Sequence, residues 1–209
     1  MGVDKRHEYA GLESIFLPIA FAVFGLVCLA VAFAGLRAWR KRRRGEPPSH
    51  WKENNPLEIG YAVVLTIVTA VLIYLTYSTE DKTDAVAGRP GLEIKAVAGQ
   101  WNWRFSYPAY GVTVQQTPTR PAEFVVPTGT TVHFTGTSQD VIHAFYVPER
   151  RFKRDLFPGR NSSFDLMWPK PVSDVGHCAE FCGLRHAEMS FHVRAVPPAA
   201  FRSWVEAHR

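Results

Sequence analysis

The sequence predicts a hairpin of two membrane-spanning helices followed by an all-β domain of the sandwich or barrel type. Two apolar runs without charge, residues 15–36 and 59–79, are each long enough to cross a bilayer core as a helix. From residue 92 onward, short runs rich in β-branched and aromatic residues alternate with Gly and Pro. A chain of 209 residues has room for these membrane segments and one domain of ordinary size.

The first apolar run, residues 15–36, is predicted to be a retained membrane helix. Residues 1–14 before it are polar and mixed in charge, and we expect an external tail there. As a helix, the 22 residues of the run would extend about 33 Å. A cleaved signal peptide is the alternative, because A-F-A-G at 32–35 resembles a cleavage site, but the run exceeds a usual signal core. Cys28, within the run, is expected to be inert packing.

Residues 37–58 are predicted to form a basic cytoplasmic loop. Six of the eight residues from Arg37 to Arg44 are basic, and Pro47 and Pro48 would stop a continuing helix. Short loops rich in Lys and Arg stay in the cytoplasm. The formal charge of +5 is therefore explained by a membrane boundary, and we expect no nucleic-acid partner.

The second apolar run, residues 59–79, completes an inside-facing hairpin. Asn55 can cap this helix, and Pro56 suits its first position. With two spans, the N-terminus and everything after residue 80 lie outside the cytoplasm. The aromatic residues expected at the outer interface are Tyr74 and Tyr77, and those at the inner one are Trp39 and Trp51.

A polar linker at 80–91 is predicted to lead into a β domain that spans 92–209. Pro197 and Pro198 start a short helix after the last strand. The eight strands expected are 92–98, 101–107, 111–116, 122–126, 130–136, 141–147, 161–168 and 189–196.

A cluster of metal-ligand side chains lies in the stretch G-H-C-A-E-F-C-G-L-R-H-A-E-M at 176–189. Cys178, Cys182, His186 and Met189 offer two thiols, an imidazole and a thioether. Soft sulfur ligands combined with imidazole suit copper. A single blue-copper site needs one Cys, whereas the doubled Cys predicts two bridged metal ions.

A second imidazole is needed, and His143 is the better candidate. His177 adjoins Cys178, so its side chain would point away from the site on an extended segment. His143 lies at the end of a predicted strand, 35 residues before that cysteine. A disulfide between the two cysteines is the simplest alternative outside the cytoplasm, and zinc is the next, although zinc seldom uses Met.

Together these residues resemble subunit II of the haem-copper cytochrome c oxidases. The family motif is C-x-E-x-C-G-x-x-H-x-x-M, with a histidine about 35 residues upstream, and this sequence matches it throughout. The resemblance covers nearly the whole chain, including the two apolar runs. It implies a cupredoxin-like Greek-key sandwich that carries the dinuclear copper centre called CuA.

The resemblance also implies roles for the ligands. Cys178 and Cys182 would bridge the coppers, and His143 and His186 would each bind one. Met189 would be a weak ligand to one copper, and the Glu180 carbonyl would bind the other. The Glu180 side chain would also reach a magnesium ion shared with subunit I, since carboxylates suit that cation.

Three further positions match the family. Trp101, in Q-W-N-W, corresponds to the tryptophan that accepts electrons from cytochrome c, although packing on a strand is the simpler interpretation. The segment with Lys153, Asp155 and Arg160 resembles the one that faces subunit I near the haem propionates. Glu58 corresponds to a glutamate at the mouth of a proton path, although a first-turn charge on a helix explains it equally.

The resemblance implies an electron-transfer subunit of a terminal oxidase in a prokaryotic plasma membrane. It would take electrons from a c-type cytochrome on the periplasmic side and pass them to haem in subunit I, with subunit III and membrane lipid as further partners. Oxygen chemistry would belong to subunit I. The alternatives are a quinol oxidase subunit, a nitric oxide reductase subunit with the same centre, and a membrane-tethered copper carrier.

One departure concerns the electron donor. The family usually has carboxylates after its aromatic stretch, but Arg104 to Pro108 contains none, and Arg150 and Arg151 add basic charge. From residue 80 onward there are 15 Lys and Arg against 13 Asp and Glu. We therefore expect a donor that is less basic than usual, or a haem domain held within a larger complex.

Overall fold

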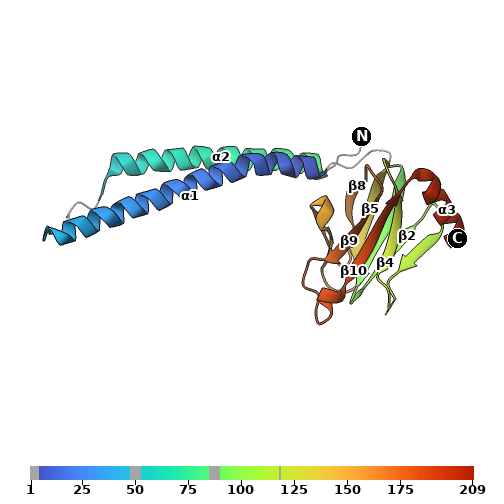
Figure 1. The fold of residues 1–209 in the computed structure, drawn as a ribbon. Helices are drawn as coiled ribbons and strands as arrows, with labels where there is room; N and C mark the ends of the chain where they lie inside the picture. The colour runs from blue at the N-terminus through green and yellow to red at the C-terminus, as the bar shows by residue number, and fades with distance from the viewer. Residues whose placement is uncertain (1–4, 48–52, 85–89, 118) are drawn as a thin grey trace. The chain divides into compact units, whose positions relative to one another are not determined.

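The chain consists of a helical hairpin and a separate β domain. The computed structural model describes residues 5–47, 53–84, 90–117 and 119–209. Residues 10–80 make up one compact unit, and the other contains residues 81–209 together with the start of α1 before Ala10. Helices α1 (Lys5–Arg43) and α2 (Asn55–Asp84) supply the first of these units and run in opposite directions (Figure 1). Within the described residues, these two helices are long and apolar enough to cross a membrane.

The helices are longer than the sequence predicted. The expected tail at 1–14 is wrong from Lys5 onward, because α1 begins there, and the expected loop at 37–58 begins only after Arg43. Arg and Lys are good helix formers, and positive charge in a last turn complements the helix dipole, so the basic run extends α1. Likewise α2 continues through Asp84, into the predicted linker. Trp51 lies outside the described residues.

The start of α2 is capped by a reciprocal pair of hydrogen bonds. The Asn54 side-chain oxygen accepts from the Leu57 N–H at 3.3 Å, and the Glu58 carboxylate accepts from the Asn54 N–H at 3.2 Å. Asn54 is therefore the cap, and the prediction of Asn55 was wrong by one residue. The pair resembles a capping box with its carboxylate one position later than usual, and it gives Glu58 a structural role.

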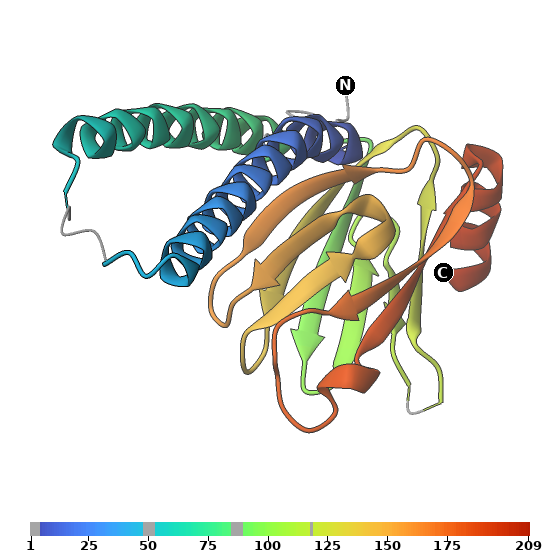
Figure 2. The ribbon, with the colours of Figure 1, turned by 60° about the vertical axis from the view of Figure 1, so that its left-hand side comes forward.

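The β domain is a sandwich of two five-stranded sheets, with strand orders β3-β2-β1-β5-β8 and β4-β10-β9-β6-β7 (Figures 1 and 2). The β1–β5 and β10–β4 pairs are parallel, and the other pairs are antiparallel. This confirms the sandwich. The strands are β1 (Leu92–Gly99), β2 (Asn102–Tyr107), β3 (Val112–Gln115), β4 (Ala122–Pro127), β5 (Thr131–Ser138), β6 (His143–Val147), β7 (Phe152–Leu156), β8 (Ser162–Met167), β9 (Val172–Cys178) and β10 (Ser190–Val196).

Aromatic rings fill the space between the sheets. Alternate side chains of β2, β5 and β10 are buried, as a sandwich requires. Phe105 and Phe124 have ring centroids 4.4 Å apart, and Phe145 and Phe191 are 4.8 Å apart. Gly176 on β9 lies under Phe191, where an added Cβ would come within 2.0 Å of the ring. Only glycine fits at this position. The Phe191 ring therefore packs directly over the backbone of β9, the strand that carries Cys178.

Two strands, β7 and β9, were not predicted. The central residues of β7 are Lys153, Arg154 and Asp155, a charged run that an edge strand tolerates. Strand β9 contains the buried Asp174, whose carboxylate accepts hydrogen bonds from Arg150 Nε at 2.7 Å and Trp168 Nε1 at 2.9 Å. These partners satisfy a charge that would otherwise be unfavourable inside a sheet.

The C-terminal helix α3 (Pro198–His208) packs against β4 and covers one end of the sandwich (Figure 2). Its buried residues are Phe201, Trp204 and Val205, as the sequence predicted. The Tyr107 ring lies 5.2 Å from the Trp204 ring. Tyr107 also exchanges two hydrogen bonds with the backbone of Val125, at 2.7 and 2.8 Å, and so ties β2 to β4.

Candidate metal centre

The candidate ligands come from two neighbouring strands and the loop between β9 and β10. His143 is the first residue of β6, and Cys178 is the last residue of β9. These strands pair, with Phe145 opposite Cys178. The Cys178 N–H donates to the Met189 carbonyl at 2.9 Å and closes the base of the loop. His177 is exposed on the opposite face of β9, as expected from its position.

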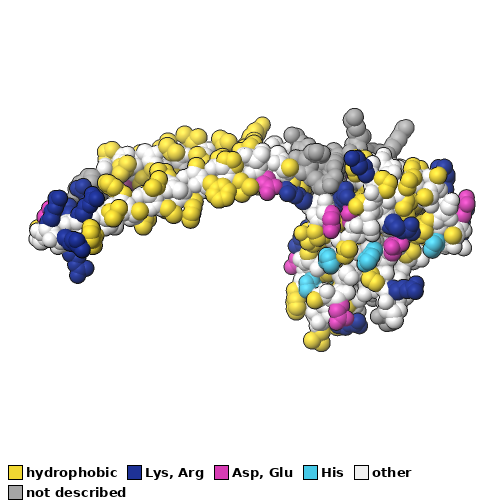
Figure 3. Space-filling view, in the orientation of Figure 1, with side chains coloured by type: hydrophobic (Ala, Val, Ile, Leu, Met, Phe, Trp, Pro, Cys, Tyr) yellow, Lys and Arg dark blue, Asp and Glu magenta, His cyan; other side chains and the backbone are white. Residues whose placement is uncertain are grey.

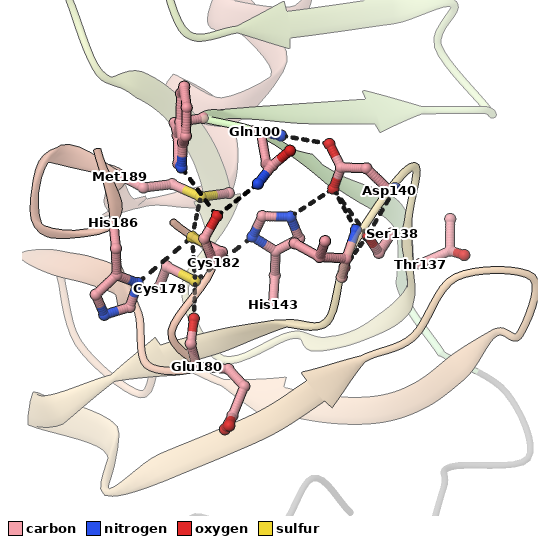
Figure 4. A network of polar contacts seen from close by, with 12 residues as sticks. Gln100, Thr137, Ser138, Asp140, His143, Cys178, Glu180, Cys182, His186 and Met189 are labelled. Carbon is pink, nitrogen blue, oxygen red and sulfur yellow. Dashed lines mark hydrogen bonds and ion pairs between the residues drawn. The ribbon is translucent and has the colours of Figure 1, made fainter. Parts of the chain in front are cut away.

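Within this frame, two sulfur atoms lie side by side between two imidazoles (Figure 4). The Sγ atoms of Cys178 and Cys182 are 3.8 Å apart. His143 Nδ1 is 3.6 Å from the Cys178 sulfur, and His186 Nδ1 is 3.4 Å from the Cys182 sulfur. Each imidazole therefore faces one sulfur of the pair. No disulfide joins the cysteines, both of which are free.

A thioether and a carbonyl complete the cluster. Met189 Sδ is 3.8 Å from the Cys182 sulfur, and the Glu180 carbonyl oxygen is 3.3 Å from the Cys178 sulfur. His143, Cys178, Cys182 and Met189 are each at most 6% exposed. The structure thus brings together all six residues that the sequence analysis selected as metal ligands.

The electrostatics of the two thiols differ. Burial raises the pKa of Cys178, but hydrogen bonds with the His143 ring, the Glu180 and Ala144 backbone and the Cys182 side chain together outweigh it and lower that pKa below its ordinary value. Burial and the adjacent Cys178 sulfur together raise the pKa of Cys182. Two neighbouring buried thiolates repel each other, so a bound cation is needed to hold both in the ionised form.

Asp140 fixes the orientation of His143. Its carboxylate lies 2.8 Å from His143 Nε2 and also accepts the Gln100 N–H at 2.6 Å and the Val141 N–H at 2.7 Å. Burial would raise the pKa of Asp140, but these hydrogen bonds lower it overall. An ionised Asp140 accepts a hydrogen bond from the Nε2–H group of His143. The proton therefore stays on Nε2, and Nδ1 presents its lone pair toward the sulfurs.

The turn between β1 and β2 holds the loop from the other side. Gln100 Nε2 donates to the Cys182 carbonyl at 2.7 Å, and Trp101 Nε1 donates to the same oxygen at 3.0 Å. Gly183 permits this approach, because its φ is +113° and a Cβ there would lie 3.2 Å from both side chains. Trp101 lies outside strand β2, which begins at Asn102. Trp103 is the core residue of the pair and is fully buried.

Sequence reasoning missed the supporting roles of Asp140, Gln100 and Gly183. The place of Asp140, three residues before His143, could have indicated its contact with the ring. Gln100 is 82 residues from Cys182 along the chain, so no local pattern connects them.

The remaining predicted residues lie apart from the sulfur pair. The Glu180 carboxylate is half-exposed and pairs with Lys153 Nζ at 3.0 Å. That ammonium is also 3.2 Å from Asp155. Arg160 lines a cavity of about 480 Å³ beside these groups. Glu58 belongs to the helical hairpin and has the capping role described above.

The donor set fits copper. Thiolate, thioether and imidazole are the soft and intermediate ligands that copper selects, and the cluster is buried in a rigid sandwich. All six donors come from protein, whereas a catalytic metal keeps an open position. The arrangement is therefore suited to holding metal for electron transfer.

Known proteins resemble this chain both in sequence and in fold. The family described as "Cytochrome C oxidase subunit II, periplasmic domain" matches residues 115–196. A probable cytochrome c oxidase subunit 2 from Streptomyces avermitilis is 30% identical over 93% of this chain and 72% of its own length. The cytochrome c oxidase subunit 2 of Mycobacterium tuberculosis H37Rv is 27% identical over 97% of this chain and 70% of its own.

Two solved structures share the β domain. The periplasmic domain of subunit II of the Bradyrhizobium japonicum cytochrome oxidase has a TM-score of 0.54 and 32% identity, covering 59% of this chain and 96% of that domain. A second subunit II domain, in a mixed disulfide with a thioredoxin-like protein, has a TM-score of 0.51 and 32% identity, over 59% of this chain and 94% of its own. With these comparisons the predicted fold class is confirmed, and the chain belongs to the cytochrome c oxidase subunit 2 family, as an electron-transfer subunit of a haem-copper oxidase.

Proposed function

We propose that this subunit takes electrons from a c-type cytochrome at a dinuclear copper centre and delivers them to haem in subunit I. The observation that carries the proposal is the sulfur pair of Cys178 and Cys182, 3.8 Å apart, with one imidazole facing each sulfur. Two bound copper ions would supply a one-electron redox centre shared between them. Cys178 and Cys182 would bridge the ions, and the terminal ligands would be His143, His186, Met189 and the Glu180 carbonyl.

The protein holds these ligands in place by bonds that do not depend on the metal. Cys178 and Met189 are tied by a backbone hydrogen bond, and Gln100 and Trp101 both bind the Cys182 carbonyl. Asp140 fixes the His143 ring. Because the ligand shell is preorganised, little rearrangement accompanies a change in its charge, which favours rapid electron transfer.

Trp101 is the residue through which we expect electrons to enter. Its indole is half-buried, so part of the ring reaches the surface. Its Nε1 binds the Cys182 carbonyl, which gives a short route from the surface ring to the Cys182 residue. Packing explains Trp103, which is fully buried, better than it explains Trp101.

The segment after β6 is the surface that we assign to subunit I. Lys153, Arg154 and Arg160 line its cavity together with Asn161 and other polar residues. The Glu180 and Asp155 carboxylates converge on the Lys153 ammonium. The Glu180 carboxylate would be the ligand that this chain supplies to a magnesium ion shared with subunit I. Subunit III is a further expected partner in the same complex.

The thiols must be reduced before they can bind metal. Sulfur atoms 3.8 Å apart need only a small movement to form a disulfide, which would consume both ligands. A related subunit II domain forms a mixed disulfide with a thioredoxin-like protein. We expect a reductant of that kind to keep Cys178 and Cys182 as thiols in this chain.

The helices anchor the subunit in the cytoplasmic membrane of a prokaryote, with the β domain on the periplasmic side. The basic end of α1 would stay in the cytoplasm, because the Lys and Arg bias sets orientation. A reporter fused after Pro90 should be active only outside the cytoplasm. Activity inside would contradict the hairpin topology. Glu58, at the same end of the hairpin as the basic residues, would stand at the entrance of a proton path of the complex.

The alternatives fit less well. A copper carrier needs an exchangeable site, whereas His143 and Met189 are at most 1% exposed. Quinol oxidase subunits normally lack these ligands, which are complete here. The relatives described above are cytochrome c oxidase subunits, which favours oxygen over nitric oxide as the substrate of the complex.

Anaerobic mixing of the copper-loaded subunit with a reduced c-type cytochrome tests the proposal. We expect one electron to pass per subunit, together with oxidation of the cytochrome haem. The metal-free protein is the control and should leave the cytochrome reduced. A loaded subunit that takes no electron would contradict the proposed function.

A further inference from the structure

The end of α1 that we assign to the cytoplasm carries a dense cluster of positive charge. Six of the eight residues from Arg37 to Arg44 are Lys or Arg. Figure 3 shows the dark-blue side chains gathered at this end of the hairpin, next to the hydrophobic side chains that cover the helices. The arrangement of these charges on the helix indicates a binding site.

Four of the basic residues lie on one face of α1 and of the turn that follows it. Arg37, Arg40, Lys41 and Arg44 follow one another at intervals of three and one, which places them along a single stripe of a helix. We call these four residues the basic stripe. Arg42 and Arg43 fall outside it, and Arg43 lies over the Trp39 ring at 4.0 Å.

The same face changes from apolar to basic within one turn. Phe33 and Leu36 continue the stripe toward the middle of the helix, and both are well exposed. A groove of about 370 Å³ runs along this face and is lined by Phe33, Leu36, the basic stripe and Glu46. A second groove beside it, lined by Ala34, Ala38 and Arg42, shares Arg37 and Lys41 with the first. A ligand that fits must be apolar at one end and anionic at the other.

The end of α1 is closed by its own backbone, which leaves the basic side chains available. Gly45 has a φ of +69° and donates to the Arg42 carbonyl at 3.2 Å, and Glu46 donates to the Lys41 carbonyl at 3.1 Å. This is a Schellman cap, so the last carbonyls need no Arg or Lys partner. Within the described residues, the ion pair seen for the stripe is Arg44 with Glu46, at 3.8 Å.

We propose that this groove binds an anionic phospholipid of the cytoplasmic leaflet, with its phosphate on the basic stripe and an acyl chain along Phe33 and Leu36. The charge-free run of α1 ends at Leu36 and the stripe begins at Arg37, which would place the stripe at the level of the lipid headgroups. Anionic headgroups attract basic clusters beside a membrane helix, by about 1 kcal/mol per residue. Nucleic acid would leave the apolar half of the groove uncovered.

Quenching of Trp39 by brominated lipid tests the proposal. The full chain is reconstituted into phosphatidylcholine vesicles that contain either brominated phosphatidylglycerol or brominated phosphatidylcholine at equal mole fraction. Subtracting the fluorescence of the Trp39→Phe variant removes the contribution of the other tryptophans. We expect stronger quenching by the brominated phosphatidylglycerol, and the ratio of the two lipids within each variant cancels changes in intrinsic fluorescence.

Matched double substitutions distinguish a site from general attraction. Arg40→Gln with Lys41→Gln removes two charges of the stripe, and we expect the preference for phosphatidylglycerol to fall on the order of tenfold. Arg42→Gln with Arg43→Gln removes the same charge off the stripe and should retain most of the preference. Equal losses in the two variants would overturn the proposal in favour of diffuse attraction. The absence of any preference in the unsubstituted chain would show that the face does not select lipid.

Two controls keep the result separate from the proposed function. The reporter fused after Pro90 shows whether each variant keeps its topology. Copper loading of the β domain should be the same in all variants, because the metal ligands belong to the other compact unit. Loss of lipid preference with intact copper loading would therefore concern the groove alone.

Discussion

Trp101 donates a hydrogen bond from its indole Nε1 to the carbonyl oxygen of Cys182, at 3.0 Å. The Gln100 side chain binds the same oxygen at 2.7 Å. The turn between β1 and β2 therefore meets the ligand loop at Cys182 itself. This contact links a partly exposed aromatic ring to one of the two buried sulfurs, and it depends on the glycine at position 183.

Removing the Trp101 ring should slow electron uptake more than it weakens donor binding. Trp101→Ala deletes both the ring and its hydrogen bond, whereas Trp101→Phe keeps a ring and loses only the bond. We expect single-turnover reduction to be slowest in the alanine variant and intermediate in the phenylalanine variant. The lost hydrogen bond should cost about 1 kcal/mol of stability, so both proteins should fold. Unchanged rates would reduce Trp101 to a packing residue.

Replacing Asp140 should weaken metal binding through His143. Asp140→Asn keeps the size of the side chain but removes the charge that orients the Nε2–H proton. Loss of such a partner typically lowers metal affinity by about 10- to 100-fold. Competition with a chelator measures this change in the loaded protein. Glu123→Gln is the control, because the Glu123 carboxylate pairs with Arg194 on the outer face of strands β4 and β10 and does not contact a metal ligand. Equal affinities in the two variants would contradict the positioning role.

Removing the Tyr107 hydroxyl should destabilise the β domain and change its response to alkali. Tyr107→Phe leaves the buried Val125 N–H and carbonyl without partners, at a cost of about 1–3 kcal/mol. Burial raises the pKa of Tyr107 above its ordinary value, so the folded state favours the neutral phenol. The resulting stabilisation is present below the unfolded pKa of about 10 and is lost as pH rises above it.

Denaturant unfolding between neutral pH and about pH 11 measures both effects of Tyr107. The unsubstituted protein should lose stability more steeply above pH 10 than Tyr107→Phe does. Tyr146→Phe, on the outer face of β6, is the matched control and should leave stability nearly unchanged. Parallel pH profiles for the native protein and Tyr107→Phe would show that the buried hydroxyl does not cause the alkaline loss.

Reduction by a basic cytochrome c should depend weakly on salt. Around the ligand loop the charges are largely matched: Arg185 pairs with Glu188 at 2.7 Å, and Lys153 pairs with Glu180 at 3.0 Å. The loop also exposes Phe181 and Leu184, which are 81% and 95% accessible. An apolar, charge-balanced surface gives little long-range attraction for salt to screen.

Stopped-flow reduction across a range of ionic strength, with a basic and an acidic cytochrome, measures this dependence. We expect a shallow or inverted slope for the basic protein. A steep fall in the rate for the basic cytochrome with salt would reveal a carboxylate patch that guides this donor.

The structure also changes the charge argument made from the sequence. Arg150 is buried against Asp174 and adds no charge to the surface, whereas Arg151 remains exposed.

Most strands could be predicted because each carries its own alternation of buried residues. Strand β5, for example, buries every second side chain from Val132 to Ser138. Strands β7 and β9 could not, because their charged residues are stabilised by distant partners: Asp174 by Arg150 and Trp168. The C-terminal end of α1 was wrong because a run of Arg and Lys can continue a helix as readily as it can form a loop.

The ligand set could be predicted because five of its six members lie within twelve residues of one another, in a fixed order. The residues that support the ligand set could not be predicted from the sequence. Gln100 reaches Asp140 across 40 residues and Cys182 across 82, so their contacts exist only after the sandwich has formed.

The central claim is that Cys178 and Cys182 hold two copper ions that share one electron. Metal analysis together with electron paramagnetic resonance of the copper-loaded chain measures this directly. We expect two coppers per chain and a hyperfine pattern from one unpaired electron spread over two equivalent copper nuclei, and we expect Cys182→Ser to abolish that pattern. One copper per chain, a spin confined to one nucleus, or a Cys178–Cys182 disulfide in the loaded protein would contradict the account.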